Sequence, residues 1–167
     1  MAERLNVHQM CKAASVTRTQ FNQWIARGYF VPEEEPVSGK PRSFSFKEAV
    51  ALGTFAELVR LGIPHDVAAQ HCRNLHGFRD EAALLMIYQG PVELIPTSER
   101  GSVLPGSGSG MKFYDPDHPP FGSEIIRLSQ LAAHAANRDV RSLAVVNLDH
   151  VEERVKAALK AAPAEPQ

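Results

Sequence analysis

Residues 16–32 constrain the fold of this chain most, because they combine a helix start, an apolar stripe and a specified stop. Thr17 is a residue that caps helix N-termini. The apolar side chains that follow stand three and four positions apart, the spacing of one buried helix face. These are Phe21, Trp24 and Ile25. Gly28 can adopt the left-handed conformation that ends a helix, and Pro32 prevents its continuation. The segment therefore predicts a short helix that packs against a core.

The opposite face of this helix is polar. Its side chains can donate hydrogen bonds to phosphate oxygens or contact base edges in a major groove. They are Arg18, Thr19, Gln20, Asn22 and Gln23. Upstream, Val7–Ala14 forms a second helical pattern with Asn6 as its cap, and only Ser15 and Val16 join the two helices. Two short helices with a tight turn between them are typical of a helix-turn-helix.

The residues after Pro32 predict further elements of the same domain. Residues 37–46 are rich in turn formers, carry Lys40 and Arg42, and end in an alternating run that we expect to pair as a small hairpin, the wing. A longer helix is expected from Ser45 or Phe46 to about Leu61, where Gly62 ends it. Another is expected from Pro64 to about Leu75.

Several dispersed motifs agree in order with one known family. They are Trp24-x-x-Arg27-Gly28-Tyr29-Phe30-x-Pro32, Arg42-x-Phe44-Ser45-x-Lys47-Glu48-Ala49-Val50 and Leu58-x-x-Leu61-Gly62-Ile63-x-x-x-x-Val67. In these motifs residues 5–75 resemble the winged-helix DNA-binding domain of the MerR family. The resemblance implies that the second helix enters the major groove as the recognition helix. It also implies that this helix begins with Thr17, Arg18, Thr19 and Gln20. It also implies that Arg42 grips phosphate from the wing, with Trp24 and Phe44 packing behind these contacts.

The chain departs from this family in two places. Family members usually continue into a long antiparallel coiled-coil helix, whereas here the helix from Pro64 spans only about a dozen residues before His76 and Gly77. The acidic run at residues 33–35 precedes the wing, where a DNA surface would prefer cations. We interpret it as a solvated loop edge that is turned away from DNA rather than as an inhibitory element.

These observations favour a sequence-specific, double-stranded DNA-binding transcriptional regulator. The expected DNA-binding residues are Lys12, Thr17, Arg18, Thr19, Gln20, Gln23, Lys40 and Arg42. Residues 1–75 hold nine Lys and Arg against seven Asp and Glu, so the positive charge is local and binding should need a dimer or tandem sites. The alternative from another class is an architectural or excisionase-like accessory factor that bends DNA or recruits a partner protein.

Little in the chain points to catalysis, a cofactor or a metal. Cys11 and Cys72 lie on apolar helical faces, where cysteine usually packs as a small apolar residue. His71, Cys72 and His76 fall within two helical turns, but adjacent side chains on a helix diverge by about 100°. We therefore expect no metal site, no cofactor and no enzymatic activity.

The second half of the chain predicts a separate small α+β domain. Strands are expected at Ala82–Tyr88, Val92–Pro96 and Ser142–Leu148, and helices at Glu124–Asn137, capped by Ser123, and from Asp149 to about Ala161. The fold class expected for the whole chain is α+β: a MerR-type winged helix-turn-helix at residues 1–76, then the α+β domain at 77–162 with a flexible loop at 101–110. Residues 163–167 are expected to be a frayed tail.

The final helix carries an apolar stripe that either covers its own sheet or meets a second copy. We favour a homodimer formed through the C-terminal domain, with double-stranded DNA as the main partner and RNA polymerase or another protein as a further one. No apolar run approaches the roughly 20 residues of a membrane span, and residues 1–6 lack a signal-peptide core. We expect a cytoplasmic protein that is associated with the nucleoid when bound to DNA.

Overall fold

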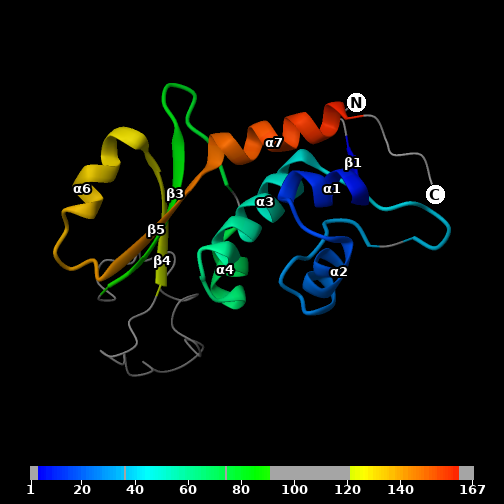
Figure 1. Cartoon of the computed structure of the whole chain (residues 1–167), viewed down its shortest axis with the longest axis horizontal. Coiled ribbons are helices and arrows are strands. Elements are labelled where there is room, and N and C mark those ends of the chain that lie inside the picture. Colours follow the sequence, from blue (N-terminus) through cyan, green and yellow to red (C-terminus); the bar gives the residue numbers. More distant parts are fainter. Residues whose placement is uncertain (1–3, 36, 74, 91–120, 162–167) are drawn as a thin grey trace. The chain divides into compact units, whose positions relative to one another are not determined.

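The computed structural model describes residues 4–35, 37–73, 75–90 and 121–161, and shows a mixed α+β chain (Figure 1). The chain divides into two compact units. The first comprises residues 1–75 together with 148–167, and the second comprises residues 76–147. The expected α+β class is confirmed, but the chain returns to its first unit at the end, which the sequence did not predict.

Three helices of the first unit begin as expected, each with a reciprocal cap. They are α1 (Val7–Ala14), α2 (Arg18–Ala26) and α3 (Phe46–Arg60). Their N-cap residues Asn6, Thr17 and Ser45 each accept a hydrogen bond from the backbone three residues on, where a Gln or Glu side chain bonds back. Gly28 and Gly62 adopt the left-handed conformation that the sequence required, with φ of 74° and 87°.

Aromatic side chains fix α2 on the core of this unit. Trp24 meets Phe55 of α3 edge to face, with ring centroids 4.7 Å apart. Phe21 meets Phe44 in the same geometry at 5.6 Å. These side chains are at most 7% exposed, so the packing role expected of Trp24 and Phe44 is confirmed. A shorter helix, α4 (His65–His71), follows α3 where a helix from Pro64 was expected.

Strand pairing differs from the small hairpin that we expected at residues 37–46. Strand β2 (Ser43–Phe44) pairs antiparallel with β1 (Leu5–Asn6), so Leu5 lies opposite Phe44. Leu5 and Phe44 are both buried, and their burial selects this long-range register over a local one. The segment between α2 and β2 is left as a loop at the edge of the unit (Figure 1).

Both alternatives that we expected for the apolar stripe of the final helix, α7 (Leu148–Lys160), are wrong. The helix packs against α1 and α3 of the first unit, neither covering its own sheet nor leaving the stripe open to a second copy (Figure 1). Leu148, Val151, Val155 and Ala158 are at most 2% exposed. Gly53 of α3 allows the close approach, because a Cβ there would lie 2.8 Å from Val151 Cγ1.

The second unit is built on a three-stranded antiparallel sheet in the order β4-β3-β5. The central strand β3 (Ala83–Gln89) pairs with β4 (Phe121–Arg127) on one side and β5 (Ser142–Asn147) on the other. Leu84, Met86, Tyr88 and Ile126 form a buried cluster, against which Leu131 and Val140 pack. Strands at 82–88 and 142–148 were expected, and β3 and β5 confirm them.

The helix expected at Glu124–Asn137 is wrong for its first part. Ser123 lies within β4 and caps no helix, and Ile126 lies opposite Leu84 in the sheet. Helical structure begins only with a 3-10 turn (Leu128–Gln130) and the five-residue α6 (Leu131–Ala135). The apolar spacing fits either structure, and pairing with the buried central strand decides for the strand.

Three expectations fall outside the described residues. These are the strand at Val92–Pro96, the flexible loop at 101–110 and the frayed tail at 163–167. In the described part of the chain, no helix has the length and apolar character needed to cross a membrane.

Candidate nucleic-acid interface

The polar face of α2 is open to solvent while its apolar face is buried. Arg18, Thr19 and Gln23 are exposed, whereas Phe21 and Trp24 are buried. The capping box at Thr17 fixes where the helix begins, and the left-handed Gly28 after it fixes where it ends. The polar side chains of α2 are therefore exposed, as the sequence predicted.

Gln20 is exposed, but its side chain is turned back to the start of α2. Its Oε1 accepts hydrogen bonds from the backbone N–H of Thr17 at 3.0 Å and from the Thr17 hydroxyl at 3.2 Å. Gln20 therefore has a capping role in addition to the DNA contact expected of it. The hydroxyl of Thr19 and the amides of Asn22 and Gln23 are exposed on this face and take no part in the capping box.

Two of the expected cations lie around one surface hollow. Lys12 of α1 and Arg18 of α2 line it, with Cys11 and Val16 among its apolar residues. We call it the α1–α2 hollow; its volume is about 610 Å³. His8 also lines it and was missed, although its spacing of four from Lys12 places both on one helix face. A third potential donor therefore joins the two cations.

Arg18 also acts electrostatically within this hollow. Burial raises the pKa of the Cys11 thiol, and the positive charge of Arg18 lowers it in part. The thiol therefore stays protonated at neutral pH and packs as a small apolar group, as expected. Cys72 is also buried and unpaired with Cys11, and burial raises its pKa further.

Lys40 and Arg42, the two cations expected of the wing, lie beside acidic side chains. Lys40 is exposed and Arg42 half-buried, and both line a hollow of about 140 Å³ together with Glu34 and Glu35. Two residues of the acidic run therefore lie next to these cations. Glu34 is partly neutralised by Arg4, whose Nη1 lies 2.9 Å from it and which also donates to the Ser43 carbonyl oxygen at 3.0 Å.

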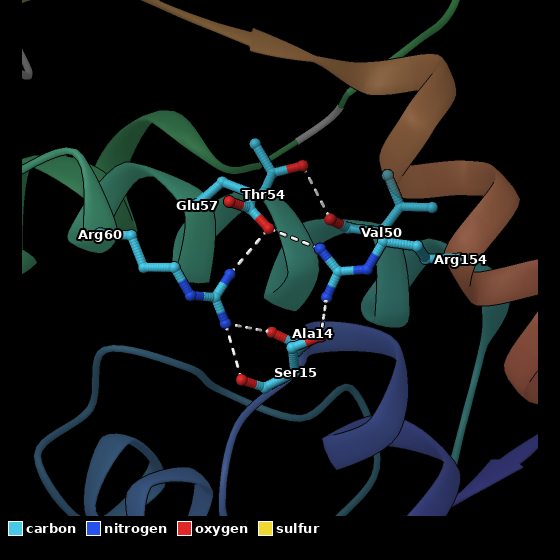
Figure 2. Close-up of polar contacts among 7 residues, drawn as sticks. All are labelled: Ala14, Ser15, Val50, Thr54, Glu57, Arg60 and Arg154. Carbon is cyan, nitrogen blue, oxygen red and sulfur yellow. Dashed lines mark hydrogen bonds and ion pairs between the residues drawn. The ribbon is translucent and has the colours of Figure 1, made fainter.

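A polar network fixes the turn between α1 and α2. Figure 2 shows Glu57 of α3 between two guanidinium groups, those of Arg60 and Arg154. Arg60 donates to the carbonyl oxygens of Ala14 and Ser15, each at 2.7 Å, and Arg154 donates to the Ser15 hydroxyl. We call these five residues the Glu57 network. It ties the turn to α3 and α7, so the last helix helps to position α2.

The residues at the end of α4 that we set aside as metal ligands, His71, Cys72 and His76, are the nearest approach to such a set in the sequence. Within residues 4–35, 37–73, 75–90 and 121–161, no three His, Cys, Asp or Glu side chains are grouped as a metal site would require. His71 is buried, and burial lowers its pKa, so it is neutral at pH 7.

The exposed face of α2 offers a set of cationic and neutral hydrogen-bond donors on a fixed helix, and such donors are suited to an anionic polymer.

Comparison with known proteins assigns no family to the chain. No family model matches it, and the curated proteins contain no significant match.

Proposed function

We propose that this protein is a transcriptional regulator that binds double-stranded DNA in a sequence-specific manner. The observation that carries the proposal is the exposed polar face of α2, which begins with Arg18 and is seated by Phe21 and Trp24. A helix fixed in this way can enter a major groove while its polar side chains meet bases and phosphates. The resemblance of residues 5–75 to the MerR domain points in the same direction.

The residues divide into two roles. Lys12 and Arg18, with Lys40 and Arg42 of the wing, would approach phosphates, because cations neutralise the backbone without regard to sequence. Thr19 and Gln23 would contact base edges, since hydroxyl and amide groups match the donor and acceptor pattern of bases. Thr17 and Gln20 would mainly fix the start of the helix, given the bonds between them.

Specific binding by this protein would require two copies. Glu34 and Glu35 offset the wing cations, so the affinity contributed by one protomer through phosphate contacts is small. A homodimer on two half-sites about one helical turn apart would supply the missing affinity. The α7 stripe is buried within the chain, so the contact between protomers would use another surface. The complex would act on the nucleoid in the cytoplasm.

A gel-shift assay with a defined inverted repeat and with random DNA, over a salt series, tests the proposal. We expect Arg18→Ala to weaken binding to both DNAs and to reduce the slope of log K against log salt by about 1. Gln23→Ala should instead alter the preference between them. The matched control is Arg138→Ala, an exposed arginine of the second unit. Equal effects of Arg18→Ala and Arg138→Ala would refute the assignment.

An accessory factor that bends DNA would give a different result in the same series. It would show little preference for the repeat, and circular-permutation gel shifts would report a bend.

A further inference from the structure

The first unit contains a pocket that the proposed DNA contacts do not use. Three parts of the chain line it: residues 29–33 after α2, one face of α3 from Lys47 to Phe55, and Ala69 of α4 with Cys72, Arg73 and Leu75 after it. Its volume is about 420 Å³, within the range of about 300–1,000 Å³ that is typical of small-molecule sites. We propose that this aromatic pocket binds a small, largely apolar molecule that carries one anionic group.

The walls of the aromatic pocket are suited to a flat apolar body. Tyr29 and Phe55 lie nearly parallel, with ring centroids 6.3 Å apart and an angle of 26° between the rings. Phe30 and Cys72 add apolar surface, and both are at most 7% exposed. A ligand ring or short aliphatic chain would find mostly carbon and sulfur here, with few polar groups to desolvate.

Two carboxylates and two cations line the pocket, and the carboxylates already accept hydrogen bonds from the protein. Glu48 is only 4% exposed, but both its oxygens are already engaged: Oε1 accepts from the Glu33 N–H at 2.8 Å and Oε2 from the Ser45 N–H at 2.6 Å. The Glu33 carboxylate lies 3.5 Å from the Ser45 hydroxyl. Lys47 and Arg73 are the cationic residues of the lining, and both are solvent-exposed. A carboxylate or sulfonate on the ligand would complement Arg73.

Two residues that line the pocket also contact the buried side chains of α2. Phe55 contacts Trp24 at 4.7 Å between centroids, and Phe30 contacts Phe21 at 5.9 Å. A ligand that displaces either pocket residue would therefore shift the buried face of α2. This regulatory consequence rests on the proposed DNA binding, whereas occupancy of the pocket does not.

Binding of 8-anilinonaphthalene-1-sulfonate to the full chain tests the pocket. This probe combines an aromatic body with a sulfonate, and we expect a saturable fluorescence increase with one molecule per chain. Ala69→Trp, which fills the pocket from α4, should weaken binding at least tenfold. Ala157→Trp, on the exposed side of α7, is the matched control and should leave binding unchanged.

A second variant keeps the test decisive if Ala69→Trp does not fold. Arg73→Ala changes an exposed side chain, and should weaken the sulfonate probe about three- to tenfold while sparing N-phenyl-1-naphthylamine, which lacks the charge. Non-saturable binding, or equal effects of Arg73→Ala on both probes, would overturn the proposal. A chain that binds the probe as expected but no DNA would refute only the proposed function, and the reverse result would refute only the pocket.

Discussion

Ser15 shows at the scale of a single residue how the helix pair is held. Ser15 is the only non-glycine residue with a positive φ in the described part of the chain, and its φ is 52°. This left-handed conformation costs an L-residue about 1–2 kcal/mol. Ser15 sits at the turn between α1 and α2, where its carbonyl oxygen and hydroxyl accept from Arg60 and Arg154. Tertiary hydrogen bonds therefore stabilise a local conformation that the sequence alone would disfavour.

Glu57→Gln tests the energetic weight of the Glu57 network. The substitution removes the negative charge from an oxygen that lies 2.7 Å from Arg60 Nη1 and 2.5 Å from Arg154 Nη1. We expect the free energy of unfolding to fall by about 1–2 kcal/mol, because hydrogen bonds to charged groups are stronger than neutral ones and the site is only partly exposed. Urea denaturation at pH 7 measures the change.

Glu152→Gln provides the matched control for this experiment. Glu152 pairs with Lys156 at 3.6 Å on the solvent side of α7, a pair of the kind that contributes about 0.3–0.5 kcal/mol. If the two substitutions shift the urea midpoint equally, the network does not stabilise the turn.

At the scale of elements, local signals in the sequence predicted most helices and missed the long-range pairings. The caps at Asn6, Thr17 and Ser45 lie within three residues of their partners, so spacing alone reveals them. The pairing of β1 with β2 and the strand at Phe121–Arg127 depend on partners tens of residues away. Periodicity cannot detect such partners.

The same limit applies to the candidate site. The sequence identified the exposed face of α2, because burial of Phe21 and Trp24 dictates which side is outward. It did not reveal that Arg154 reaches the α1–α2 turn from 139 positions away. Nor did it show that Glu34 and Glu35 share a hollow with Lys40 and Arg42.

Gly53→Leu tests the packing of α7 on α3. A side chain at this position would overlap Val151, since even a Cβ would stand 2.8 Å from Val151 Cγ1. Although leucine favours helix, overpacking typically costs about 1–3 kcal/mol, so we expect a net loss of stability. Thermal unfolding followed by circular dichroism measures it. Ala157→Leu, on the exposed side of α7, should change the stability by less than about 0.5 kcal/mol. A Gly53→Leu melting temperature equal to that of the wild type would contradict the close contact.

At the scale of the whole chain, the first unit is discontinuous in sequence. Residues 76–147 form the second unit and are inserted between two parts of the first. Because Leu148 directly follows the end of β5 at Asn147, the second unit is joined to the first at both of its ends. The Gln9 side chain strengthens the closure, since its Nε2 donates to the carbonyl oxygens of Leu159 and Ala161 at the end of α7. The α1–α2 pair therefore depends on residues from both ends of the chain.

Truncation after Asn147 tests this dependence. Removing α7 exposes the surface of α1 and α3 that Leu148, Val151 and Val155 cover. Each fully buried side chain of this kind contributes about 1.5–3 kcal/mol, and a domain has only about 5–15 kcal/mol in total. We therefore expect the first unit to lose cooperative unfolding and DNA binding together, whatever the oligomeric state of the chain. Circular dichroism melts and sedimentation velocity on the same samples separate this outcome from a loss of dimerisation alone.

The full-length double variant Val151→Ala, Val155→Ala should show a milder loss of the same kind. The truncated chain could instead melt like the wild type and sediment with about half the mass of the full-length species. That result would assign α7 to the contact between protomers.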